Sequence, residues 1–103
     1  MKEKNIIQEK SFAFAVRAVK LFKYLQEVKR AFVLSKQFLR SATSIGANVE
    51  ESIGGQSGKD FLSKLSIAYK EARETMYWLR LLQAADYLTQ SEAESMLTDA
   101  EER

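Results

Sequence analysis

The chain has 103 residues and a formal net charge of +2 at pH 7, with 46% hydrophobic and 29% charged residues, which is the balance of one globular domain. It contains neither cysteine nor histidine, which excludes disulfides, thiolate metal sites and the commonest general base. It has no proline and only four glycines, which favours long helices over a β-rich fold. The absence of histidine and cysteine argues against an enzyme.

The first predicted helix covers about residues 11–28, with Ser11 as its N-cap. Two apolar stripes run along it at helical spacing. The first stripe contains Phe12, Val16, Val19 and Phe22. The second stripe contains Phe14, Ala18, Leu21, Leu25 and Val28. A helix of a monomeric bundle needs only one broad apolar face, so the surplus stripe predicts that the chain self-associates.

The second predicted helix covers about residues 32–53 and is apolar at every third or fourth position. Apart from Ile45, its middle from Ser41 to Ala47 consists of small side chains, and the serines, threonine and glycine among them are mediocre helix formers. Their small size allows a neighbouring helix to approach closely. The run therefore predicts a packing seam, either within the subunit or between subunits, before Gly54 and Gly55 end the helix.

The third predicted helix covers about residues 58–85. Ser57 lies three residues before Asp60, which approximates a capping box. The predicted core row of this helix contains Phe61, Leu65, Ala68, Ala72, Leu79 and Leu82. A second row of three large apolar residues runs beside it: Leu62, Tyr69 and Met76. This row adds to the surplus apolar surface and strengthens the prediction of self-association.

The fourth predicted helix covers about residues 90–102 and opens with Thr89 and Glu92, a capping box of the Thr-x-x-Glu type. At about 1.5 Å per residue, it reaches only about half the length of the third helix. We therefore expect that either the natural chain continues beyond Arg103 or another subunit covers the bare end of the third helix.

The sequence shows no targeting or membrane segment. The first ten residues are mostly polar, whereas a secretory signal needs a longer apolar run. No window approaches the roughly 20 apolar residues of a membrane span. Together with the missing cysteine, this predicts a cytoplasmic protein that has no membrane partner.

The charges are distributed unevenly along the chain. Residues 1–40 contain ten Lys and Arg against three Glu, whereas residues 41–103 contain six Lys and Arg against eleven Asp and Glu. Two interpretations are open: a solvated surface that pairs with the acidic half, or a basic face that binds nucleic acid. The candidate contacts for the second are Lys20, Lys23, Lys29, Arg30, Lys36 and Arg40.

The glycine-rich segment from Gly54 to Lys59 superficially resembles a phosphate-binding loop. The spacing would require glycine at Ile53, Asp60 replaces the magnesium-binding Ser or Thr, and no strand precedes the segment. A turn between antiparallel helices is the better interpretation.

Two side-chain groups could suggest other sites. The carboxylates Glu50, Glu51, Glu71 and Glu74 could suggest a metal centre, but di-iron bundles use Glu-x-x-His pairs and this chain has no histidine. We therefore predict neither a metal site nor a cofactor. Four aromatic residues cluster in and after the third predicted helix: Tyr69, Tyr77, Trp78 and Tyr87. They could stack on bases, but aromatics at helical spacing more often belong to a core or a subunit interface.

Two segments of the chain resemble a known family. Residues 34–51, LSKQFLRSATSIGANVEE, resemble the signature of the S23-like proteins, which are encoded in intervening sequences of bacterial large-subunit ribosomal RNA genes. Residues 61–82 and the turn from Gly55 to Ser57 are also similar to that family. The similarity extends from Lys10 to Leu88, and a related branch contains the accessory variability proteins of retroelements.

The resemblance implies an antiparallel up-down-up-down four-helix bundle that forms a ring-like homopentamer. It also implies a relationship to the retroelement branch, whose members bind nucleic acid and a reverse transcriptase. Four positions match the family's polar positions: Ser44, Asn48, Glu51 and Glu74. We expect their amide and carboxylates to satisfy one another in a helix seam. Ser52 departs from the family pattern, which commonly has glycine there.

Residues 1–103 are thus predicted to form a single all-α domain that is not catalytic and needs no cofactor. The favoured function is a homo-oligomer that binds RNA, DNA or a protein partner through its basic face. The alternative is a purely structural homo-oligomer without a nucleic-acid ligand. Salt-dependent RNA binding would distinguish them, because phosphate contacts weaken steeply as salt rises.

Overall fold

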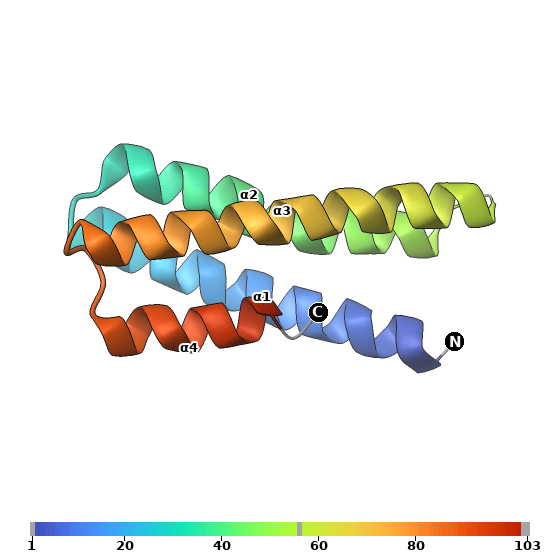
Figure 1. The fold of residues 1–103 in the computed structure, drawn as a ribbon, viewed down its shortest axis with the longest axis horizontal. Helices are drawn as coiled ribbons and strands as arrows, with labels where there is room; N and C mark the ends of the chain where they lie inside the picture. Colours follow the sequence, from blue (N-terminus) through green and yellow to red (C-terminus); the bar gives the residue numbers. More distant parts are fainter. Residues whose placement is uncertain (1, 56, 102–103) are drawn as a thin grey trace.

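The computed structural model describes residues 2–55 and 57–101, which form four helices. They are α1 (Lys2–Glu27), α2 (Phe32–Ile53), α3 (Gly58–Ala84) and α4 (Gln90–Glu101). Figure 1 shows that successive helices run in opposite directions. The predicted all-α, up-down-up-down bundle is therefore confirmed. None of the described helices is both long and apolar enough to cross a membrane.

The start of α1 differs from the prediction. The helix begins at Lys2 instead of Ser11, because no glycine or proline interrupts the preceding residues. Ser11 is therefore not an N-cap but an interior residue that is 1% exposed. Its hydroxyl donates a hydrogen bond of 3.1 Å to the carbonyl of Gln8. Serine satisfies its hydroxyl inside a helix in this way, by donating to a carbonyl, whereas at an N-cap its oxygen accepts from a backbone amide.

The predicted caps of the later helices are confirmed. The Ser57 hydroxyl accepts a 3.1 Å hydrogen bond from the Asp60 amide at the start of α3. Before α4, the Glu92 amide donates to the Thr89 hydroxyl at 3.1 Å, and the Glu92 carboxylate accepts from the Thr89 amide at 2.8 Å. Both helices therefore begin where local chemistry places them. Residue 102, where α4 was predicted to end, lies outside the described residues.

The two stripes of α1 have different environments. Phe14, Ala18 and Leu25 of the second stripe are buried in the core. Phe12 of the first stripe is 66% exposed, and Val16 and Val19 of the same stripe are exposed as well. The first stripe is thus the surplus apolar surface. Val28, which the prediction placed in the second stripe, is exposed because α1 ends at Glu27.

Two of the small residues of α2, Ser41 and Gly46, pack against other helices of the subunit, whereas Ala47 is exposed. Gly46 faces the backbone of α1 so closely that a Cβ atom there would lie 3.4 Å from the carbonyl oxygen of Ser11. On the opposite flank of α2, the buried Ser41 contacts Thr75 of α3. Side chains of minimal volume therefore allow α2 to approach both of its neighbours.

The bundle is complete at only one end. Figure 1 shows α4 beside the half of α1 and α3 that is nearest to the α1–α2 and α3–α4 turns. The other half of the bundle, which contains the α2–α3 turn, consists of three helices among the described residues. This difference in length leaves part of α1 and α3 without a fourth helix.

Candidate functional site

The predicted cations lie on the surface of α1, α2 and their connection. They are Lys20, Lys23, Lys29, Arg30, Lys36 and Arg40, all of which are exposed, and we call the first five the basic face. The first five lie in the last two turns of α1, in the connection and early in α2. They therefore gather around the end of the bundle where α1 joins α2 (Figure 1).

These five cations lack carboxylate partners among the described side chains. The ion pairs among the described side chains involve other residues: Arg17–Asp99, Arg40–Glu71, Arg40–Glu74 and Lys64–Glu51. Residues 10–49 contain eight Lys and Arg but only one acidic residue, Glu27, so the local sequence offers little compensation. The Arg30 guanidinium lies 5.3 Å from the centroid of the Phe32 ring, a cation–π contact that does not neutralise its charge.

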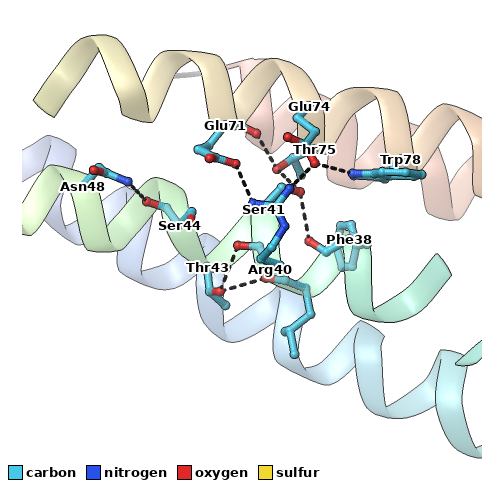
Figure 2. A network of polar contacts seen from close by, with 11 residues as sticks. Phe38, Arg40, Ser41, Thr43, Ser44, Asn48, Glu71, Glu74, Thr75 and Trp78 are labelled. Carbon is cyan, nitrogen blue, oxygen red and sulfur yellow. Dashed lines mark hydrogen bonds and ion pairs between the residues drawn. The ribbon is translucent and has the colours of Figure 1, made fainter. Parts of the chain in front are cut away.

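Arg40 differs from the other five because it is bound to α3. Its Nη1 lies 3.4 Å from Glu71 Oε1, and its other terminal nitrogen binds Glu74 (Figure 2). The hydrogen bond with Glu74 raises the pKa of the Arg40 guanidinium above its usual value. The structure thus separates Arg40 from the group in which the sequence prediction placed it.

Glu74 is the centre of a small polar network. The indole Nε1 of Trp78 donates a hydrogen bond of 2.9 Å to its carboxylate, which also binds Arg40 (Figure 2). The hydrogen bond from Trp78, followed by that from Arg40, holds the pKa of the Glu74 carboxyl below its usual value. The charged carboxylate therefore links two side chains that belong to different helices.

The other polar-motif residues have separate partners. The Asn48 side-chain amide donates to the Ser44 carbonyl within α2 at 2.9 Å. Glu51 forms a 2.9 Å ion pair with Lys64 of α3, which raises the pKa of the Lys64 ammonium group. Among the described side chains, the motif amide and carboxylates do not contact one another, contrary to the expected arrangement. A structural role for these four positions remains a prediction.

A buried hydroxyl pair was missed by the sequence interpretation. Thr75 Oγ1 lies 3.0 Å from Ser41 Oγ and 2.7 Å from the Glu71 carbonyl, while Ser41 Oγ donates to the Phe38 carbonyl at 3.2 Å (Figure 2). Both hydroxyls are fully buried. The sequence did contain a sign of this pair, because Thr75 is the polar residue among the otherwise apolar buried residues of α3. We call these contacts, together with those of Arg40, the α2–α3 seam.

The acidic residues form no metal centre in the described part of the chain. Glu50 accepts hydrogen bonds from the Gln8 side chain at 2.8 and 2.9 Å, and the other three candidate carboxylates contact Lys64 or Arg40. Across the side chains of residues 6–55 and 57–100, no three Asp or Glu residues converge as a metal site. Gln56 of the glycine-rich turn lies outside the described residues.

The aromatic residues occupy several environments instead of one surface. The Tyr77 and Trp78 rings meet edge to face at 5.1 Å, and Tyr87 packs against the core. Tyr69 is exposed, with the Arg73 guanidinium 6.0 Å from its ring centroid. This arrangement offers no continuous platform for successive bases among the described residues.

Comparison with known proteins identifies relatives of the chain. The family model of the 23S rRNA-intervening sequence protein matches residues 3–103. The fold is also similar to the 1.70 Å crystal structure of a protein of unknown function from the S23 ribosomal protein family of Bacteroides thetaiotaomicron VPI-5482. That similarity has a TM-score of 0.96 and 51% identity, and covers 99% of this chain and 90% of the other. No curated protein matches significantly.

Proposed function

Because the chain belongs to the 23S rRNA-intervening sequence protein family, whose crystallised S23 relative has unknown function, we propose that it is a non-catalytic, self-associating protein that binds nucleic acid in the cytoplasm. The contacts are made by the basic face. The observation that carries this proposal is a group of five exposed cations around the α1–α2 connection that lack carboxylate partners among the described side chains.

The ion pairs favour this function over a neutralised surface. If the basic half merely balanced the acidic half, its cations would be paired across helices. Arg17 and Arg40 do behave in that way, whereas Lys20, Lys23 and Lys36 have no carboxylate partner among the described side chains. Unpaired lysine and arginine side chains can displace counterions from phosphates, which provides sequence-independent affinity.

Self-association would multiply this weak site. The exposed stripe of Phe12, Val16 and Val19 supplies an apolar surface on α1 that a second copy can cover. An assembly repeats the basic face in every subunit, so that a long polyanion binds several copies at once. We favour a pentamer because of the family resemblance. The alternative, a purely structural homo-oligomer, shares this surface but needs no phosphate contact.

The test is binding of a labelled single-stranded RNA oligonucleotide, measured by fluorescence anisotropy over a range of salt concentrations. Replacing Lys20, Lys23, Lys29 and Arg30 with glutamine is expected to weaken binding to all sequences alike. The slope of log K against log salt should flatten by about 0.7 for each phosphate group that the variant no longer binds.

The matched control is a second quadruple variant, in which Lys59, Lys70, Arg73 and Arg80 become glutamine. These four cations are exposed on α3, so the net charge changes equally while the basic face stays intact. Equal loss of binding in both variants would indicate a non-specific charge effect. Absence of RNA and DNA binding by the parent at low salt would leave the structural alternative.

Sedimentation of the parent at micromolar concentration tests self-association separately. We expect a mass of several chains. A monomer mass would contradict the proposed assembly, whatever the outcome of the RNA measurement.

A further inference from the structure

The channel between α1 and α3 is only half filled by α4. Beyond the end of α4 it continues as an open groove of about 400 Å³, lined by residues of all four helices. Six of its ten lining residues come from α3. Ala100, in the last turn of α4, forms one end of the groove, so the groove continues the path of α4 (Figure 1).

The side chains of α3 along this channel follow a heptad pattern. The row contains Leu62, Leu65, Tyr69, Ala72, Met76 and Leu79, spaced alternately by three and four residues. The middle four line the groove, and Leu62 and Leu79 continue the row at its two ends. Such a row is the packing surface of one helix for another, because each apolar side chain of the partner fits into a hole formed by four side chains of the facing helix. The row therefore indicates that a helix, instead of an extended strand or a loop, fits this groove.

The two ends of the heptad row differ in coverage. Leu79 is fully buried in the core cluster, which also contains Met96 of α4, and Met76 packs against that cluster. Leu62 and Tyr69, at the other end, are 66% and 63% exposed. The heptad row is thus buried at the end near α4 and exposed at its other end.

The charges identify the kind of helix that fits. The sequence of α4 contains four acidic residues and no basic residue, and Arg17 of α1 binds its Asp99. The cations continue past the end of α4. Arg73 lines the groove on α3, and Lys10 follows the lining residue Ile7 by one helical turn on α1. An acidic helix that continued the path of α4 would therefore meet Arg73 and Lys10, as Asp99 of α4 meets Arg17.

We propose that the open groove binds an acidic amphipathic helix of a partner protein, placed end to end with α4. The difference between the 27 residues of α3 and the 12 residues of α4 corresponds to about 22 Å of helix, or about four turns. This site is separate from the basic face, which lies at the other end of the bundle (Figure 1), and sedimentation of the groove variants separates it from the proposed self-association.

The probe is a labelled synthetic peptide of about 18 residues, blocked at both termini, with Leu and Met on one helical face and Glu elsewhere. A second peptide replaces every Glu with Lys. Fluorescence anisotropy with the full chain is expected to show saturable binding of the acidic peptide that weakens with salt. The lysine peptide should bind at least about tenfold more weakly, since each factor of ten requires only about 1.4 kcal/mol.

Variants then locate the binding surface. The double variant Leu62→Ser and Tyr69→Ser should raise the Kd of the acidic peptide at least about tenfold, because two large apolar side chains are no longer there to be buried. The matched control is Tyr77→Ser, an equally polar change at an exposed aromatic residue of α3 outside the heptad row. Arg73→Gln should weaken binding more than Lys70→Gln does. RNA binding should stay unchanged in the double variant, which separates this proposal from the proposed function.

Four results would overturn the proposal. They are absence of peptide binding, equal binding of the lysine peptide, equal effects of the double variant and Tyr77→Ser, and loss of self-association in the double variant. The last result, measured by sedimentation, would assign the groove to a second copy of the chain. Circular dichroism of every variant confirms that the comparison is made between folded proteins.

Discussion

The α2–α3 seam and the basic face contain the same kinds of charged residue in opposite circumstances. In the seam, Arg40 is bound by Glu71 and Glu74. Lys36, only one helical turn earlier on α2, has no such partner among the described side chains. The comparison teaches that position along a helix does not determine whether a cation stabilises the fold or stays available to a ligand. The presence of a carboxylate on the neighbouring helix does.

The largest expected effect compares a buried and an exposed phenylalanine. Phe38 is fully buried in the core beside the seam, whereas Phe12 lies on the exposed stripe of α1. Phe38→Ala should lower the free energy of unfolding by about 3–5 kcal/mol, measured by urea denaturation. Phe12→Ala should change that quantity by less than about 0.5 kcal/mol under conditions in which the chain is monomeric.

Sedimentation is the second measurement on the Phe38→Ala and Phe12→Ala variants. If the stripe of α1 is covered by a second copy, Phe12→Ala should weaken self-association while the monomer keeps its stability. A large loss of monomer stability in Phe12→Ala would show that the stripe belongs to the core instead.

Smaller effects are expected for Arg40 and Lys36 of α2, and the two substitutions should affect stability and RNA binding in opposite order. Arg40→Gln should cost about 0.5–1 kcal/mol of stability, because the ion pairs with Glu71 and Glu74 are partly exposed and solvent weakens them. Lys36→Gln should leave stability unchanged within about 0.5 kcal/mol. In RNA binding the order should reverse, with Lys36→Gln flattening the salt slope by about 0.7 and Arg40→Gln having less effect. If both substitutions affect both measurements equally, the distinction between seam and basic face fails.

The smallest effect concerns the pH dependence of the seam. Because Trp78 and Arg40 hold the pKa of the Glu74 carboxyl below its ordinary value of 4.5, the folded state binds fewer protons there than the unfolded chain. The stabilisation is therefore present above that ordinary value and is lost as the pH falls through the depressed pKa of the folded state. The urea midpoint of the parent should drop more steeply on acidification than that of Glu74→Gln.

The matched variant for this measurement is Glu94→Gln, an exposed glutamate on α4 that lies outside the seam. It should follow the parent through the acid range. Parallel curves for the parent and Glu74→Gln would mean that the network contributes no pH-dependent stability.

Much of the fold could be predicted because helix boundaries depend on chemistry within a few residues. The caps at Ser57 and Thr89 are local, and their partners lie three residues away. Ser11 shows the limit of this reasoning, since one hydroxyl serves equally as a cap or as an interior donor to a carbonyl. Which of the two roles Ser11 takes depends on whether the residues before it are helical, as they are here.

The candidate site was harder to predict because its partners are distant in sequence. The six predicted cations are all exposed in the structure. That Arg40 is bound, however, depends on carboxylates 31 and 34 positions later. The contact of Ser41 with Thr75 likewise joins residues 34 positions apart.

By itself the sequence determined the helical class, the number of helices, the later caps and the surplus of apolar surface, because these follow from composition, helical periodicity and local hydrogen bonds. The tertiary structure alone decided which stripe of α1 enters the core, which cations are paired and where α4 leaves the channel open. Both stripes of α1 have helical spacing, so periodicity cannot choose between them. That choice arises only when α2 and α3 approach, because burial and ion pairing are properties of neighbouring helices.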